Sequence, residues 1–381
     1  MLKKILEKLG LSSVVYKLER CYSRNTRDYA PSSLEDAYSY LGSLYDRSMK
    51  SCIVEHTPIP YDCDLEIIVP CYNVEKYVEE CIDSILNQET RYSFFLTIVN
   101  DGSKDGTRSV LQKYENIKNV KIIDQHNKGF SGARNTGISQ AHGKYLIFVD
   151  SDDVLMPGAI EHFMTLAFKT DADVVDGGHI RFADRTGNNG IISRIKADIY
   201  DLVQRPQTLP YNEKSPGITG YPCGKVLKAE LFHRVQFPEG FWFEDTLIWM
   251  IVAPLCKRMA TTDFIAFRYR MNPDSISHQA SSKIKSLDSL FITLQLLKDR
   301  ERLGIEFDQD QYDMLLRQMR MNFCRVQSLP EKIKQAVFTV QQDLIVNRFK
   351  DWTTSNQDVK PIENFMEQND YNGFRLWCKW H

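Results

Sequence analysis

The sequence predicts an α/β protein with a mostly parallel central sheet and helical additions at both ends of the chain. Short apolar runs alternate with helix-spaced apolar residues between residues 65 and 175. The runs are apolar throughout, as in strands that are buried on both faces. The chain of 381 residues is also too long for one compact core, so we expect one larger domain with additions.

Strands and helices are expected in regular alternation through the first half of the chain. The expected strands are residues 65–69, 94–99, 120–123, 145–149 and 172–175, and the expected helices are residues 78–85, 107–114, 134–141 and 159–168. Asn73 is a candidate N-cap for the first helix. Gly, Pro and Asn then favour loops, before a strong helix after Glu244, a strand over 264–270 and helical patterns over 282–349.

Composition excludes several classes of protein. The 48 Lys and Arg residues balance 50 Asp and Glu residues, which argues against nucleic acid as a partner. No uncharged apolar run reaches about 18 residues, so no membrane-spanning helix is expected. Nine scattered cysteines without a CxxC pair favour a reducing compartment, and charges interrupt the first ten residues where a secretion signal would be apolar. We therefore expect a cytoplasmic protein.

The first 30 residues form a basic amphipathic pattern. Leu2, Ile5, Leu6 and Leu9 have helical spacing, and seven Lys or Arg residues oppose three Asp or Glu residues. Such a helix can rest on the anionic inner face of a cell membrane. It can also dock on the protein's own core, and we favour docking because apolar stripes are common on core-facing helices.

Polar residues follow three of the expected strands, at residues 70–73, 100–106 and 150–153. In an open parallel sheet, ligands bind beyond the carboxyl ends of the strands. The sharpest of these segments is Asp150-Ser151-Asp152-Asp153, because three neighbouring carboxylates repel one another unless a positive group joins them. Mg²⁺ or Mn²⁺ meets that need with one or two carboxylates and phosphate oxygens. The alternative is a solvated turn that caps the helix after Pro157.

Two further segments suit a nucleotide. Asp101 follows an apolar strand and can accept the N3–H of uracil, although it can equally accept from guanine or form a simple turn. Residues 126–137 are rich in Gly and lead into a helix that carries Arg134. A helix N-terminus with an arginine suits a diphosphate. The alternative is a flexible loop.

Glu244-Asp245 opens the strongest helix of the second half. An acidic pair in a first helical turn usually compensates the helix dipole. The preceding Phe241-Trp242-Phe243 could instead wall a sugar site, where an aspartate could act as a general base.

Together, Val69 to Asn73, Asn100 to Ser103, Gly129 to Gly137, Asp150 to Asp153 and Glu244-Asp245 resemble the family-2 glycosyltransferases of the GT-A fold, of the bacterial surface-polysaccharide type. The resemblance covers roughly residues 65–280. It implies an N-terminal helical extension over 1–62, a glycosyltransferase domain over 63–280 with a donor half (63–180) and an acceptor half (181–280), and a C-terminal helical region over 281–381.

The resemblance also implies an activity and a site. It implies inverting transfer from a UDP-sugar to a glycan or a lipid-linked saccharide, assisted by Mn²⁺ or Mg²⁺. Carried over, Asp245 is the catalytic base, and Asp152 and His278 hold the metal. The donor-binding residues that it implies are Pro70, Tyr72, Asp101, Asn127, Arg134, Asp150 and Ser151.

Two other classes stay open on the residues alone. A nucleotidyltransferase shares the α/β sheet and the acidic metal site, but it should carry a basic Gly-rich loop after the first strand, where this chain has Pro70 to Glu75. A catalytically inactive scaffold would lack a key carboxylate, whereas Asp101, Asp152 and Asp245 are all present.

Overall fold

The computed structural model describes residues 16, 19–20, 33–45, 50–55, 60–182, 192–193, 198–201, 220–271 and 282–380. The chain forms two compact units. One comprises Ser48–Pro273 and Leu294–Glu306, and the other comprises Met1–Arg47, Asp274–Thr293 and Phe307–His381.

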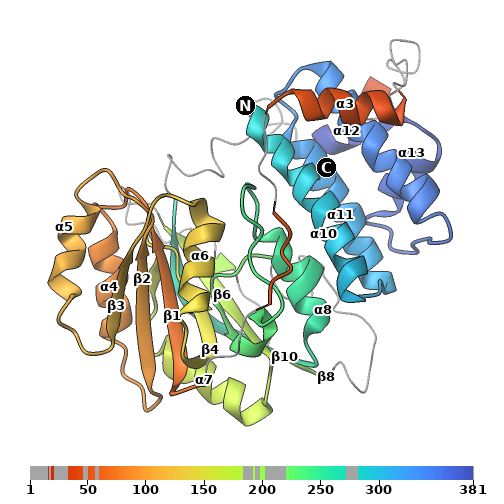
Figure 1. The fold of residues 1–381 in the computed structure, drawn as a ribbon. Coiled ribbons are helices and arrows are strands. Elements are labelled where there is room, and N and C mark those ends of the chain that lie inside the picture. Colours follow the sequence, from red (N-terminus) through yellow and green to blue (C-terminus); the bar gives the residue numbers. More distant parts are fainter. Residues whose placement is uncertain are drawn as a thin grey trace. The chain divides into compact units, whose positions relative to one another are not determined.

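The first unit is built on a single sheet (Figure 1). The strand order is β3-β2-β1-β4-β9-β6-β10-β5, with β7 beside β6 and β8 beside β10. The strands are β1 (Cys63–Cys71), β2 (Phe94–Asn100), β3 (Val120–Asp124), β4 (Gly143–Phe148), β5 (Val154–Leu155), β6 (Val174–Phe182), β7 (Ile192–Ser193), β8 (Asp198–Asp201), β9 (Lys225–Lys228) and β10 (Arg258–Arg270).

The expected parallel sheet is confirmed in its first half. β3, β2, β1 and β4 all run parallel. β9 then enters antiparallel to both of its neighbours, β4 and β6, while β6 and β10 again pair in parallel. The short strand β9 therefore joins two parallel groups of strands, and the sheet as a whole is mixed.

Both faces of the central strand β1 are covered, as its apolar run predicts. Leu65, Ile67 and Val69 lie in one core cluster with the buried residues of α4 (Val78–Leu86) and α7 (Ala159–Thr170). Ile68 faces α6 (Gly129–Ser139), where a Cβ atom on Gly137 would lie 2.4 Å from the Ile68 Cγ2 atom. Gly137 thus lets α6 lie directly on β1.

The expected helices of the first half are confirmed, with three corrections. α5 (Thr107–Leu111) ends in a 3₁₀ turn, η1 (Gln112–Tyr114). α6 begins at Gly129, five residues before its expected start, because its early glycines hide the helical pattern. Asn73 does not cap α4, which Tyr77 precedes; Asn73 has φ of 53°, and its Oδ1 atom accepts from Lys104 N at 2.8 Å.

The second half departs further from expectation. The strong helix after Glu244 is a π-helical segment, η3 (Ile248–Val252), followed by α8 (Ala253–Leu255). β6 continues to Phe182 although the pattern predicts an end at residue 175. Gly177 interrupts the apolar pattern because the Phe163 ring lies where a side chain would be, 2.6 Å from its ideal Cβ position. A 3₁₀ turn, η2 (Ala229–Phe232), follows β9.

The second unit is helical, as the C-terminal patterns predict. Its N-terminal helix α3 (Leu34–Ser43) packs against α12, so the two additions form one unit. The other elements are η5 (Ile284–Leu287), the first part of α10 (Asp288–Leu303), α11 (Gln309–Arg325), α12 (Glu331–Asp343), η6 (Leu344–Arg348), α13 (Lys360–Glu367) and α14 (Tyr371–Trp380).

The sequence predicts no membrane-spanning helix and a basic amphipathic pattern in its first 30 residues. None of the helices in the described ranges is long and apolar enough to cross a membrane. The apolar stripe of residues 2–9 lies outside the described residues.

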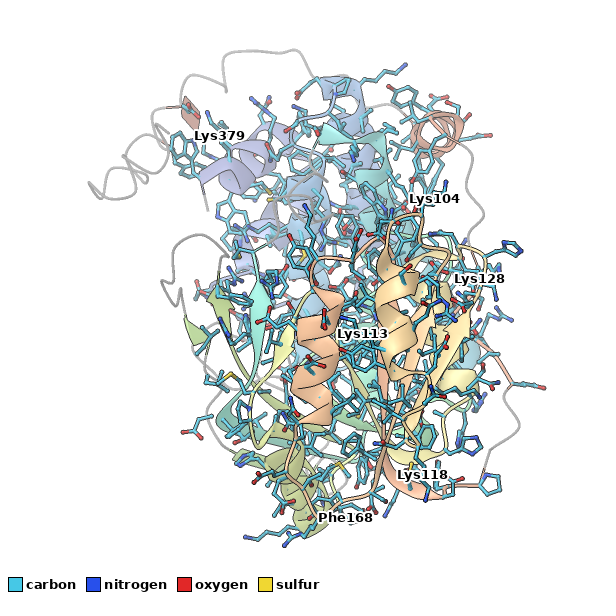
Figure 2. The ribbon with its side chains drawn as sticks, turned by 90° about the vertical axis from the view of Figure 1, so that its left-hand side faces the viewer. Lys104, Lys113, Lys118, Lys128, Phe168 and Lys379 are labelled. Atoms are coloured by element: carbon cyan, nitrogen blue, oxygen red, sulfur yellow. The ribbon has the colours of Figure 1, made fainter. Side chains whose placement is uncertain are left out.

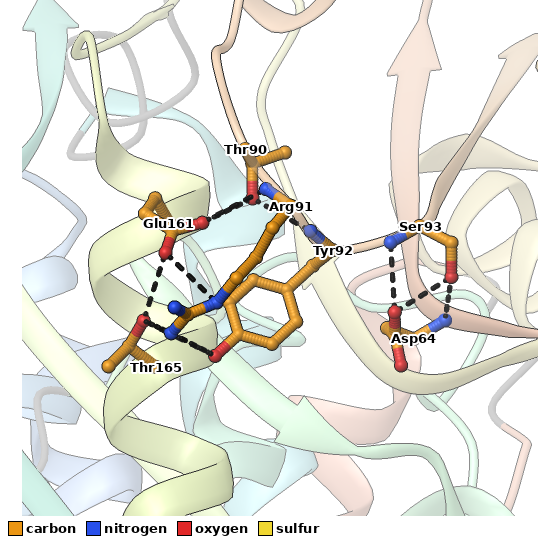
Figure 3. Close-up of polar contacts among 7 residues, drawn as sticks. All are labelled: Asp64, Thr90, Arg91, Tyr92, Ser93, Glu161 and Thr165. Carbon is orange, nitrogen blue, oxygen red and sulfur yellow. Dashed lines mark hydrogen bonds and ion pairs between the residues drawn. The ribbon is translucent and has the colours of Figure 1, made fainter.

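Polar residues at the amino-terminal end of the sheet satisfy one another (Figure 3). Asp64 accepts from the Ser93 backbone and hydroxyl, both at 2.8 Å. Glu161 accepts from Thr90 and from the Arg91 backbone. Figure 2 shows Lys118 and Phe168 at this end, and Lys104 and Lys128 at the opposite end, where β2 and β3 finish. These contacts fix the loops at the amino-terminal end of the sheet.

The contact between α6 and β1 can be tested with glycine substitutions. Gly137→Ala should destabilise the protein by about 1–3 kcal/mol, the usual cost of overpacking. Gly42→Ala is the control, because Gly42 is exposed in α3 and nothing lies within 4 Å of its ideal Cβ position. Alanine at this helical position should increase the free energy of unfolding by about 0.5–1 kcal/mol. Urea unfolding followed by circular dichroism measures both changes. Equal stability of Gly137→Ala and the parent protein would contradict the close packing.

Candidate active site

The loops after β1 and β2 hold each other by reciprocal hydrogen bonds. Asn73 N donates to Ser103 Oγ at 3.1 Å, and the Glu75 carboxylate accepts from Gly106 N at 2.9 Å. A Cβ atom on Gly106 would collide with that carboxylate. Pro70 and Cys71 are buried at the end of β1, whereas Tyr72 is 41% exposed. These hydrogen bonds hold the two loops together, and the Tyr72 side chain is exposed at the carboxyl end of β1.

Asp101 is buried and caps α6. Its Oδ1 atom accepts from Lys128 N at 2.8 Å and from Gln125 Nε2 at 2.7 Å, and its Oδ2 atom accepts from Gly129 N at 2.8 Å. Asp101 is only 2% exposed. The negative group at this helix N-terminus is therefore Asp101, at the position where the sequence suggested a diphosphate. Asn127, in the same loop, is exposed.

Arg134 links two acidic segments that lie far apart in the sequence. Its Nη2 atom donates to Asp150 Oδ1 at 2.9 Å, and its Nη1 atom pairs with Glu244 Oε1, 110 residues away. The Arg134 side chain is only 4% exposed, and its Nε atom is buried without a hydrogen-bond partner. Its guanidinium also lies 5.3 Å from the Phe237 ring centroid. Arg134 therefore belongs to the inner wall of the site.

The charge of Arg134 is secured by its partners. Burial lowers its pKa, but the carboxylates of Asp150 and Glu244 raise it, and the net effect is a pKa above the ordinary arginine value. One cation between two carboxylates leaves a net negative charge at the end of β4.

α6 also holds the segment that leads to Glu244. Ser131 Oγ donates to Pro238 O at 2.8 Å. Asn135 exchanges two hydrogen bonds with the backbone of Phe237, at 2.8 and 2.9 Å. The same helix thus fixes both the strand end at Asp150 and the turn that carries the acidic pair.

The three aspartates after β4 differ in their surroundings. Asp153 is 1% exposed, its Oδ1 atom accepts from Arg270 N at 2.9 Å, and its Oδ2 atom is buried without a partner. Burial first, and then the charges of Asp150 and Asp152, raise the pKa of Asp153. Asp150 and Asp152 are partly exposed, and Ser151 is buried. Asp153 therefore faces the interior, and the other two aspartates can be reached from solution.

The sequence offered two interpretations of this segment, a cap for the following helix and a metal site. The aspartates do not cap α7, because its N-cap is Gly158. Within the described ranges, no three His, Cys, Asp or Glu side chains gather as a ready-made metal site. His278 lies outside the described residues. Asp150 and Asp152 fit an ion that takes one or two carboxylates and completes its shell with phosphate oxygens.

Glu244 and Asp245 lie in a tight turn before η3. Phe243 adopts φ of 66°, and Ile248 N donates to Asp245 O at 2.9 Å. Both acidic side chains are partly buried. Of the three aromatic residues before them, Phe241 is buried, while Trp242 and Phe243 are partly exposed and meet edge-on, with ring centroids 6.3 Å apart.

Sequence reasoning missed a buried ionic group within the sheet. Lys225 on β9 and Asp176 on β6 are both fully buried, with Lys225 Nζ 3.1 Å from Asp176 Oδ1. His179 on β6 is also buried, and burial, Arg181 and Lys225 lower its pKa to about 4. The one local sign of this ion pair in the sequence was a lysine at the start of the short apolar strand Lys225–Lys228.

A surface depression of about 1170 Å³ lies elsewhere on this unit. It is lined by α7 and by β10 residues, among them His162, whose ring stacks on Phe264 at 4.5 Å. None of the predicted site residues lines it. The depression is therefore separate from the group formed by Asp150, Arg134 and Glu244.

Comparison with known proteins gives a consistent result. Residues 66–235 match the family model described as glycosyl transferase family 2. Glycosyltransferase GlyG of Streptococcus pneumoniae is 30% identical over 219 residues, which span 56% of this chain and 72% of that protein. Glycosyltransferase GlyA of the same organism is also 30% identical, but the match spans only 32% of its length.

The chain is also similar to a protein whose name specifies its activity and to a solved structure. The Escherichia coli protein named UDP-Glc:alpha-D-GlcNAc-diphosphoundecaprenol beta-1,3-glucosyltransferase WfgD is 29% identical over 58% of this chain and 82% of that protein. The structure of Staphylococcus aureus TarS 1-349 in complex with UDP-GlcNAc has a TM-score of 0.50 and 19% identity, and covers 82% of this chain and 89% of that one. The structural likeness shows the GT-A fold. The family model and the match to GlyG show that this chain belongs to glycosyltransferase family 2.

Proposed function

We propose that the protein transfers a sugar from a UDP-sugar to a hydroxyl of a glycan or a lipid-linked saccharide, with inversion at the anomeric carbon. The observation that supports this most is the double ion pair of Arg134, which joins Asp150 to Glu244. It brings the strand end of Asp150 to Asp153 next to the turn of Glu244-Asp245. Sugar transfer requires these two functions side by side: stabilisation of a leaving diphosphate and a base for the acceptor.

The substrate class is supported by the relatives. The name of WfgD specifies a UDP-glucose donor and an acceptor on diphosphoundecaprenol. Another relative, 28% identical, is the minor teichoic acid biosynthesis protein GgaB of Bacillus subtilis. An acceptor on a lipid carrier would bring the protein to the inner face of the cell membrane, so we include peripheral membrane contact in the proposal.

The nucleoside is proposed to bind where β1 and β2 end. Pro70 and Tyr72 would flank the base, and Tyr72 is exposed there. Asp101 Oδ2 accepts one hydrogen bond, from Gly129 N, which leaves it acceptor capacity for the uracil N3–H. Asn127 and Ser151 would contact the donor from the adjoining strand ends.

Mn²⁺ or Mg²⁺ is proposed to bind at Asp152, with His278 as a second ligand. Asp152 is partly exposed whereas Asp153 is turned inward, so Asp152 is the carboxylate that suits an ion arriving with the diphosphate. The bound ion would act as a Lewis acid that stabilises the charge of the departing UDP.

Asp245 is proposed as the general base. The motif places the base at Asp245, and the ion pair of Glu244 with Arg134 gives the other member of the pair a structural role. Asp245 would take the proton of the acceptor hydroxyl as the hydroxyl oxygen attacks the anomeric carbon. A single base without a carboxylate nucleophile gives inversion. A family member that binds UDP without transferring sugar remains the second candidate.

The nucleoside site can be tested with UDP alone. Asp101→Ala should weaken UDP binding by about 1.5–3 kcal/mol, the value of a hydrogen bond to a charged group. It should also lower stability, because the cap of α6 is lost. Asp105→Ala is the control, since Asp105 similarly caps Thr107 in the loop after β2 but is not assigned to the nucleoside. Calorimetry with UDP separates the two roles. Equal UDP affinity of Asp101→Ala and Asp105→Ala would remove Asp101 from the binding site.

The metal site can be tested by comparing adjacent aspartates. Asp152→Asn should abolish transfer and the effect of Mn²⁺ on UDP binding while the fold persists, because its side chain is partly exposed. Asp153→Asn should instead keep the response to Mn²⁺ at little cost in stability, because burial and the charges of Asp150 and Asp152 raise the pKa of the Asp153 carboxyl group and disfavour its ionised form. Calorimetry of UDP binding with and without Mn²⁺ reads out both variants. Retention of most activity by Asp152→Asn in the presence of Mn²⁺ would refute the assignment.

The base can be tested within the acidic pair. UDP release from a panel of UDP-sugars first identifies a donor. Asp245→Asn should then lower turnover by about 10²–10⁴-fold with little change in UDP affinity. Glu244→Gln should cost stability, because it weakens the Arg134 ion pair, and should lower turnover less. An active Asp245→Asn with an inactive Glu244→Gln would mean that the wrong member of the pair has been assigned. UDP binding without consumption of any donor would favour the inactive-binder alternative.

A further inference from the structure

Asp101, the residue proposed to bind the nucleobase, is held from one side by Gln125. Gln125 directly follows β3, and its backbone N donates to Asn100 O at 3.0 Å. Its side-chain Nε2 atom donates to Asp101 Oδ1 at 2.7 Å. Gly102 allows the two loops to approach closely, because a Cβ atom there would lie 3.0 Å from Asn127 N. The turn after β2 therefore lies directly on the loop after β3.

The orientation of the Gln125 amide is set by Thr136 on α6. Thr136 Oγ1 donates to Gln125 Oε1 at 2.6 Å. Because a carboxylate only accepts hydrogen bonds, the nitrogen end of the amide faces Asp101 and the oxygen end faces Thr136. Asp101 in turn caps the first turn of the same helix. The contacts form a closed ring that runs from α6 through Asp101 and Gln125 back to α6.

This ring divides the acceptor capacity of Asp101 unevenly between its two oxygen atoms. Each carboxylate oxygen has two lone pairs that can accept a hydrogen bond. Oδ1 accepts from Lys128 N and from Gln125 Nε2, so both of its lone pairs are used. Oδ2 accepts from Gly129 N, which leaves it one lone pair. Asp101 therefore offers a ligand a single acceptor site.

A single acceptor site distinguishes uracil from guanine. Uracil presents one donor, N3–H, between two carbonyl oxygens. Guanine presents two adjacent donors, N1–H and the exocyclic amino group, which pair best with both oxygens of a carboxylate. With Oδ1 of Asp101 already occupied, one guanine donor would lose its partner on binding, and a donor left unpaired costs affinity. The motif around Asp101 alone leaves this choice of base open.

We infer that Gln125 is a positioning residue that sets the selectivity for uracil over guanine by occupying Oδ1 of Asp101. It acts through Asp101, and Thr136 keeps its amide in the orientation that this requires. This inference deepens the proposed function and rests on the nucleoside site at Asp101.

The test compares the affinities for UDP and GDP. Gln125→Leu removes the amide while keeping a side chain of similar size, so one lone pair of Asp101 Oδ1 becomes available to guanine. The dissociation constant of GDP divided by that of UDP should therefore fall by about tenfold or more, the effect of one hydrogen bond to a charged group. Calorimetry with UDP, and displacement of UDP by GDP, measure the two constants. A purely structural role of Gln125 would weaken both nucleotides alike and leave the ratio unchanged.

Two matched variants separate orientation of the amide from stability. Thr136→Val removes the hydroxyl that orients the Gln125 amide at nearly constant volume, and it should move the ratio in the same direction by a smaller factor. Gln140→Leu is the control, because it makes the same change at the C-cap of α6, where Gln140 Oε1 accepts from Lys121 Nζ at 2.8 Å. This control should leave the ratio at the value of the parent protein. Melting temperatures show that each variant is folded.

UDP methylated at the uracil N3 atom keeps the inference and the proposed function apart. Equal affinity of the parent protein for UDP and for the methylated nucleotide would overturn the nucleoside site at Asp101 itself. A clear preference for UDP over the methylated nucleotide, with an unchanged ratio in Gln125→Leu, would overturn the inference alone. Thr136→Val gives the same decision if Gln125→Leu does not fold. Equal affinity of the parent protein for UDP and GDP would also overturn the inference.

Discussion

Burying a guanidinium that is only 4% exposed is costly unless carboxylates compensate its charge, and Arg134 has two such partners, Asp150 and Glu244. Removal of either carboxylate would leave one arm of the guanidinium without its ion-pair partner. The constraint therefore ties the end of β4 to a turn that lies 110 residues after Arg134 in the chain. After this pairing, two carboxylates and one guanidinium leave a net negative charge at the carboxyl edge of the sheet.

The two ends of the sheet use polar residues in different ways. At the amino-terminal end, Glu161 and Asp64 are saturated by neighbouring hydroxyl and amide groups, so they fix loops. At the carboxyl end, Tyr72 is exposed and Asp152 is partly exposed. A parallel sheet brings its strand ends together only at this edge, which explains why binding residues from distant parts of the sequence meet there.

Local patterns were sufficient to predict the first half of the fold. Continuous apolar runs gave β1, β2 and β4, because a strand buried on both faces carries no polar alternation. The start of α6 was missed because its early glycines carry no apolar periodicity, and its cap, Asp101, comes from another loop. The π-helical segment after Glu244 has the same side-chain periodicity as an ordinary helix over so few residues.

The ionic groups of the site depend on long-range pairing that no local pattern contains. Lys225 meets Asp176 only because β9 enters antiparallel between β4 and β6. Arg134 was assigned to the donor from its motif, whereas its ion pair with Glu244 depends on the folded chain. Motif spacing could therefore name most of the acidic residues, but not which cation neutralises each of them.

The position of α6 has a mechanical consequence. The helix has 11 residues, so it is a rod about 16 Å long at 1.5 Å per residue. Its first turn is held by Asp101, its middle holds Asp150 and Glu244 through Arg134, and its last turns rest on β1 at Gly137. One rigid helix therefore connects the loop after β2 with the turn that carries Glu244 and Asp245, and its seat on β1 depends on the glycine at position 137.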